Sequence, residues 1–123
     1  MDKPWAIIAV AAVVADTDEE AEFLAGTYDL NWLRRAKGEM LPLPSPQEAA
    51  AYPWTEQERR YIARRRARLF CGSAQTVSER LRLFAADTEA DEIMITSSIW
   101  DHALRKRSYE LLAAEWGRLR EVA

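Results

Sequence analysis

The chain has 123 residues, of which 49% are hydrophobic and 30% charged, and its formal net charge is −3. This length suits one domain, the hydrophobic content excludes a disordered chain, and the acidic balance argues against a general attraction to nucleic acid. A single cysteine, Cys71, excludes an internal disulfide and fits a reducing cytoplasm, while a single histidine argues against a histidine-based metal site.

The longest apolar run, AIIAVAAVVA at residues 6–15, predicts a buried strand. It is too short to cross a membrane, which takes about 20 residues. A secretory signal peptide is the alternative, because Lys3 precedes the run and small residues precede Asp16. The β-branched content, together with Asp2 and Pro4 ahead of the run, favours the strand. Because apolar residues do not alternate with polar ones, both faces of this strand should be covered, as in a parallel sheet.

Capping boxes and apolar spacing predict the helices. Thr17, Ser45 and Thr55 are each followed three residues later by a glutamate, and Ser73 is a further N-cap candidate. The predicted helices cover residues 17–37, 55–70, 74–88 and 101–116, with a short helix at 46–51. Residues 38–54 hold four of the five prolines and are predicted to be a connecting segment.

A second apolar stretch predicts another buried strand at residues 92–98. The order strand, helices, strand, helix indicates parallel strands joined by helical crossovers, and therefore an α/β fold. Two parallel strands make an incomplete sheet, since their edges would be unpaired and both faces need cover. The residues therefore indicate part of a larger α/β structure.

Six arginines lie between Arg59 and Arg68, which is the densest charge cluster of the chain. A phosphate or nucleic-acid patch is one interpretation. A solvated helix face is the other, with ion pairs such as that between Glu56 and Arg60. The acidic net charge favours the solvated face.

Two further motifs have weak chemical signals. In CGSAQTV, the backbone N–H groups after Gly72 could face an anion, but the motif is no P-loop and ordinary capping by Ser73 is favoured. Cys71 and His102 could be a nucleophile and its base, although their spacing does not bring them together.

Polar residues follow the second strand directly, as they often do at a catalytic rim. The rim candidates are Ser97, Ser98, Asp101 and His102. For Asp101 a helix-capping role is the alternative.

Several segments together resemble a known family. DKPWAIIAVAAVVADTDEEAEFLA, the proline-rich LPLPSPQEA and CGSAQTVSERLRLFAADTEADEIMITSSIWDHALRKRSYELLA look like the C-terminal part of bacterial luciferase-like, flavin-dependent monooxygenases. The resemblance runs from Asp2 to about Ala114. Its most specific segments are residues 14–21, 72–77, 90–94, 101–105 and 107–113.

The resemblance implies a (β/α)₈ barrel that uses reduced flavin, most similar to the subgroup that takes flavin mononucleotide (FMN), and molecular oxygen. A full barrel takes about 250 residues, so this chain would be one partial domain, residues 1–123, with the last two β/α units. The family's active-site histidine and most flavin contacts lie in earlier strands, so no catalytic residue is assigned. Ser97, Ser98, Asp101 and His102 would lie nearest the flavin or substrate of a completed barrel.

The resulting expectation is a truncated or split luciferase-like monooxygenase that is inactive without the missing N-terminal strands. Alone, it would not hold FMN tightly; a complementing N-terminal barrel fragment would be its partner, and a small molecule its substrate once completed. The alternative is a non-catalytic module that self-associates through its strand edges. A nucleic-acid adaptor using Arg59 to Arg68 is a third, weaker idea, and neither nucleic acid nor membrane is an expected partner.

Overall fold

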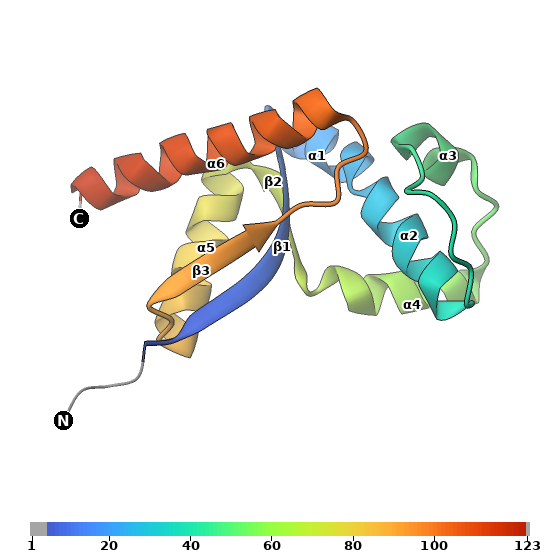
Figure 1. Cartoon of the computed structure of the whole chain (residues 1–123), viewed down its shortest axis with the longest axis horizontal. Helices are drawn as coiled ribbons and strands as arrows, with labels where there is room; N and C mark the ends of the chain where they lie inside the picture. Colours follow the sequence, from blue (N-terminus) through green and yellow to red (C-terminus); the bar gives the residue numbers. More distant parts are fainter. Residues whose placement is uncertain (1–4, 123) are drawn as a thin grey trace.

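The computed structural model describes the backbone of residues 5–122 and the side chains of residues 5–116. Its elements, in chain order, are β1 (Ile7–Ala15), α1 (Asp18–Leu24), α2 (Gly26–Ala36), α3 (Pro46–Ala51), α4 (Glu56–Arg66), β2 (Leu69–Ser73), α5 (Ala74–Thr88), β3 (Glu92–Thr96) and α6 (His102–Val122). In Figure 1, α2, α3 and α4 gather at one end of the molecule, while α5 and α6 lie beside the strands. No helix within residues 5–122 is long and apolar enough to cross a membrane.

The strands form one parallel sheet in the order β2-β1-β3. Residues 7–11 of β1 pair with residues 92–96 of β3, so the parallel pairing of the two predicted strands is confirmed. Residues 11–15 of β1 pair with β2, which the sequence did not predict. The predicted count of two strands is therefore wrong, because the described sheet has three. The sequence did not reveal β2 because five residues are too few to show the hydrophobic periodicity of a strand.

The strand order bears on the predicted barrel fragment. A barrel joins its strands in chain order, which would place β2 between β1 and β3. The described sheet instead has β1 in its centre and is open at both edges. The α/β class with parallel strands is confirmed, and the barrel fragment stays a prediction.

Helices cover both faces of the carboxyl-terminal half of β1, which explains why its apolar run does not alternate. On one face, Val13 and Ala15 pack in a buried cluster with residues of α1, α2 and β2. On the other face, Ala12 and Val14 pack with residues of α5 and α6. A third cluster holds α2, α3 and α4 together; it consists of Leu30, Leu33, Ala49 and Ile62.

The amino-terminal half of the sheet is less covered. Ile7 of β1 is 55% exposed and Met94 of β3 is 57% exposed, on the face that α1 and α2 cover further along. Ala9, which pairs with Met94, and Thr96, two residues further along β3, are exposed as well. An apolar surface therefore remains open where β1 and β3 pair.

The predicted N-caps are confirmed, since the side chains of Thr17, Ser45, Thr55 and Ser73 each accept a hydrogen bond from the first turn of a helix. The predicted helix at residues 17–37 is two helices that meet at Ala25. Gly26 begins the second, where a Cβ atom would lie 2.9 Å from the Cβ of Ala49. The glycine thus lets α3 approach α2 closely.

One strand edge is closed by a side chain of α6. Beyond Ala11, β3 no longer pairs with β1. There the backbone N–H of Val14 donates to Oγ of Ser108 at 3.0 Å, and Ser108 is buried. A buried N–H without a partner would cost free energy, so this contact fixes α6 against the central strand.

Replacing Ser108 with alanine should lower the free energy of unfolding by about 1–3 kcal/mol, because the N–H of Val14 loses its buried acceptor. Urea unfolding measures the change. Ser78→Ala is the matched control: Ser78 is also buried, but its hydroxyl has no hydrogen-bond partner in the described structure, so its removal should cost little. Equal losses in both variants would contradict the assigned role of Ser108.

Candidate functional site

The carboxyl ends of the three parallel strands meet at one edge of the sheet. Asp16 follows β1, Ser73 ends β2, and Ser97 and Ser98 follow β3. In open parallel sheets and in barrels, ligands bind at this edge. These residues are therefore the first place to look for a site.

The start of α5 is occupied by a carboxylate of the chain itself. Oδ1 of Asp18 accepts the backbone N–H of Ser73 at 2.7 Å, and this hydrogen bond is the main reason why the pKa of Asp18 is lowered. A Cβ atom on Gly72 would lie 2.7 Å from the same oxygen, and Gly72 has a φ of +150°, which favours glycine. Capping within the chain is thus what CGSAQTV does here.

An ion pair closes the end of β1. Arg107 of α6 donates to both oxygens of Asp16, at 2.6 and 3.2 Å. The hydrogen bond from Arg107 is the main cause that lowers the pKa of Asp16. The sequence pattern did not single out this pair, because 91 residues separate its members.

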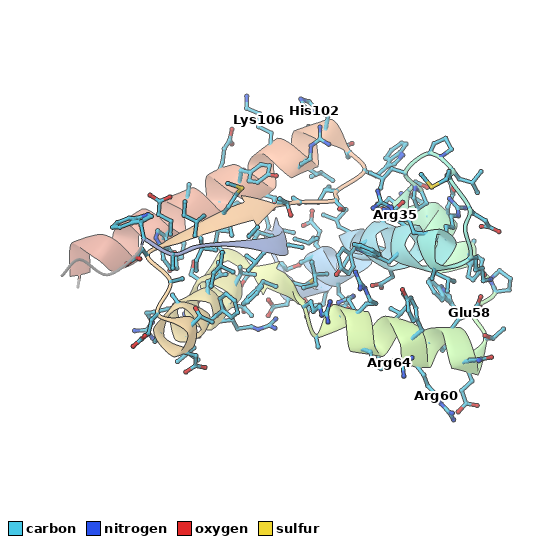
Figure 2. All side chains as sticks on the ribbon, turned by 60° about the horizontal axis from the view of Figure 1, so that its bottom comes forward. Arg35, Glu58, Arg60, Arg64, His102 and Lys106 are labelled. Atoms are coloured by element: carbon cyan, nitrogen blue, oxygen red, sulfur yellow. The ribbon has the colours of Figure 1, made fainter. Side chains whose placement is uncertain are left out.

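The rim candidates point in different directions. Oδ1 of Asp101 accepts the backbone N–H of Leu104 at 3.1 Å, so Asp101 caps α6. His102 is exposed and its Nδ1 lies 2.9 Å from a guanidinium nitrogen of Arg105. Figure 2 shows His102 projecting away from the fold at the start of α6. Oγ of Ser97 is buried without a hydrogen-bond partner among the described residues, and Ser98 is half-buried.

Cys71 and His102 are not brought together as nucleophile and base. The Sγ of Cys71 lies 3.7 Å from a carboxylate oxygen of Glu22, whereas His102 contacts Arg105. Burial is the main reason why the pKa of Cys71 is raised to about 11. The thiol is therefore protonated at neutral pH and is a weak nucleophile.

Most of the six arginines from Arg59 to Arg68 form the solvated face that was expected. Arg59, Arg60, Arg64 and Arg68 are exposed. Figure 2 shows Arg60 and Arg64 pointing away from α4 on the outer side of the molecule. Arg60 also makes the predicted pair with Glu56, at 2.8 Å.

Arg65 and Arg66 differ, and for them the solvated-face interpretation is wrong. The guanidinium of Arg65 stacks 3.8 Å from the ring centroid of Trp32, and its Nε is buried without a partner among the described residues. Nε of Arg66 donates to Oδ1 of Asp29 at 2.8 Å, and its other nitrogens bind Glu22. These partners lie on α1 and α2, so only the packing of α4 reveals them.

Arg66 thus holds two carboxylates in a partly buried cluster. Burial is the main influence on Asp29 and raises its pKa to about 6, although the attraction of Arg66 acts in the opposite direction. Side-chain exposure of Asp29 is only 15%. No group of three or more metal-ligating side chains occurs in the described part of the chain.

Comparison with known proteins relates about nine tenths of the chain to about one third of longer proteins. No protein-family model matches it. It is 39% identical to the uncharacterized protein YceB of Bacillus subtilis (strain 168) over 110 residues, which are 89% of this chain and 33% of that protein. It is 29% identical to a luciferase-like monooxygenase of Escherichia coli (strain K12) over 111 residues, which are 90% of this chain and 33% of that protein.

A solved structure extends the similarity to the backbone. The crystal structure of apo-MsnO8 matches with a TM-score of 0.80 and 30% identity, over 94% of this chain and 35% of that one. The similarity to luciferase-like monooxygenases that the sequence suggested is therefore confirmed. The chain spans about one third of the length of these relatives.

The raised pKa of Asp29 predicts a stability that falls as the pH rises from about 4 to 6. The folded state holds this proton more tightly than the unfolded state, so ionisation of Asp29 favours unfolding across that window and adds nothing further above it. Asp29→Asn removes the ionisation. The stability difference between this variant and the unaltered chain should therefore change by about 1–3 kcal/mol between pH 4 and pH 6.

Urea unfolding at half-unit pH steps measures this difference. Glu56→Gln is the control, since Glu56 and its partner Arg60 are both largely exposed and their pair should contribute little. A difference for Asp29→Asn that stays constant from pH 4 to 7 would contradict the assignment.

Proposed function

We propose that this chain is the C-terminal part of a luciferase-like, flavin-dependent monooxygenase and that it acts only together with the remaining part. One observation carries the proposal: about 90% of the chain aligns with one third of a protein named luciferase-like monooxygenase. The matching backbone of apo-MsnO8 supports it. FMN would be the cofactor and a small molecule the substrate of the completed enzyme.

The uncovered half of the sheet supports the idea of a missing part. Parallel sheets are covered on both faces, yet Ile7, Ala9, Met94 and Thr96 leave one face of the β1–β3 pair open. A polypeptide with the remaining strands and helices would cover that face. We propose this complementing N-terminal part as the partner of the chain.

The residues present do not by themselves fit a flavin. At the carboxyl edge of the sheet, Asp16 is paired with Arg107, Asp18 with the N–H of Ser73, and Asp101 caps α6. The three carboxylates therefore already have hydrogen-bond partners within the chain, and His102 is exposed. A cofactor site needs a concave pocket that encloses most of the ligand, and contacts from further strands would have to build it. Ser97, Ser98, Asp101 and His102 stay the proposed rim residues of the completed site.

FMN titration tests the proposal. The purified chain alone should give no saturable quenching of FMN fluorescence at low micromolar concentration, because its half-formed site cannot offset the cost of ordering the ligand. Co-expression with the part of the Escherichia coli luciferase-like monooxygenase that the chain does not match should restore a complex that binds FMN. Saturable binding by the monomeric chain, or a stable complex without FMN binding, would contradict it.

Self-association is the second candidate function, and the open edge of β3 favours it. Among the described residues, β3 pairs only with β1, so its other edge is free. Met94 is an exposed apolar side chain on β3 itself, and Ile7 is another on the neighbouring β1. A free edge with apolar neighbours is a template for pairing with another strand. A non-catalytic module that forms homo-oligomers would use this surface.

Sedimentation velocity separates the two candidates. If the module self-associates through β3, the chain should sediment as a dimer or larger species, and Met94→Lys should return it to a monomer. Leu83→Lys is the matched control: Leu83 is 64% exposed on the helix α5 rather than on a strand, and its replacement should leave the assembly intact. A compact monomer at high concentration would remove this candidate.

A further inference from the structure

A separate pocket lies among α1, α2, α3 and α4, the four helices that lie between β1 and β2 in the sequence. Its volume is about 580 Å³, and residues of α1, α2, α3 and α4 line it together with Trp54. No strand residue and none of the rim candidates contributes to this lining. Sites for small molecules commonly have volumes of roughly 300–1,000 Å³, so this helical pocket is large enough for one.

The pocket combines apolar walls with a charged floor. Ala49, Ile62 and the indole of Trp54 belong to the walls. Glu22, Asp29 and Arg66 are the charged residues that we call its floor; Asp29 and Arg66 are largely buried, whereas Glu22 is 64% exposed.

The floor has more negative than positive charge when both carboxylates are ionised. Arg66 is one cation between two carboxylates, because its Nε binds Asp29 and its other nitrogens bind Glu22. Only Oδ1 of Asp29 has a hydrogen bond in the described structure, so its second oxygen is left to accept another donor. The side chain of Asp29 is largely buried, and a buried carboxylate gains from a second cationic partner.

We propose that the helical pocket binds a small organic ammonium ion with an apolar body. The ammonium group would donate to Asp29 and Glu22, and the apolar body would lie against Ala49 and Ile62. The indole of Trp54 adds to the preference, because an aromatic face attracts a cation. This binding is independent of flavin and of the proposed monooxygenase function.

An organic anion fits the same pocket less well. Three of the five N–H groups of Arg66 already donate to carboxylates, and an anion that approached the remaining two would meet the negative charges of Glu22 and Asp29. Arg59 is the cation at the rim of the pocket, and it is exposed to water. Its repulsion of an ammonium ion is screened by solvent, and its removal should favour cation binding.

Benzylammonium is the probe, with benzoate and benzyl alcohol as matched ligands of opposite and no charge. Titration at pH 7.5, followed by the ¹H–¹⁵N signal of the Trp54 indole, should show saturable binding of benzylammonium and weaker binding of the other two. Asp29→Asn should weaken benzylammonium binding by about tenfold or more, since a charged hydrogen bond is lost. Arg59→Gln should strengthen it slightly and weaken benzoate.

A second variant and a pH series keep the test valid if Asp29→Asn does not fold. Ala63→Phe adds an aromatic ring to the pocket lining and should abolish binding, while the unaltered chain should bind more weakly at pH 5 than at pH 7.5. The charged and titratable groups that interact with Asp29 are Glu22 of α1, Arg66 of α4 and Cys71 of β2. At pH 5 Asp29 is largely protonated, so it no longer attracts benzylammonium, which keeps its charge.

Three outcomes would overturn the proposal. Benzoate binding as tightly as benzylammonium would refute the charge preference. Binding that persists unchanged in Ala63→Phe would refute the location. Absence of saturable binding, with the Trp54 signal unmoved, would refute the site. FMN is absent from all these measurements, so none of the outcomes depends on the proposed monooxygenase function.

Discussion

The rest of the structure depends on the central strand β1, because both edges of this strand need hydrogen-bond partners and both of its faces need to be covered. In its carboxyl-terminal half, both edges and both faces have partners: β2 pairs with one edge, Ser108 accepts the N–H of Val14 on the other, and helices cover each face. The ion pair between Asp16 and Arg107 lies just beyond, at the strand's end. Polar contacts and apolar packing therefore fix α6 at the same place.

The amino-terminal half of β1 is less completely covered. It pairs with β3, but the face that bears Ile7 and Met94 stays exposed. That imbalance agrees with the comparisons, in which the chain corresponds to one third of longer proteins. It also explains why two proposals compete, because a complementing polypeptide and a second copy of the chain would each cover exposed apolar residues of the β1–β3 pair.

The sequence predicted those features that local chemistry determines. Both long apolar runs are parallel strands, and Thr17, Ser45, Thr55 and Ser73 cap helices as their spacing indicated. It missed β2, whose five residues follow an arginine-rich helix without a turn signal. It also missed the ion pairs between distant segments, such as those of Arg66 with Asp29 and of Arg107 with Asp16. Such pairs depend on how helices pack, and single-sequence periodicity does not contain that information.

The helical pocket shows why packing decides what a charged residue can do. On an exposed face of α4, Arg66 would be one more solvated cation, equivalent to Arg64. Packed between α1 and α2, it neutralises part of the charge of Glu22 and Asp29 but does not remove the cost of burying Asp29, because desolvation outweighs its attraction there. A carboxylate in that state is held by the fold without being fully satisfied. An additional cation from solution would reduce the remaining cost, and the cavity beside Asp29 is large enough to admit one with an apolar body. Burial of the ionised Asp29 therefore lowers stability at neutral pH, and the same cost would be partly relieved by a bound cation.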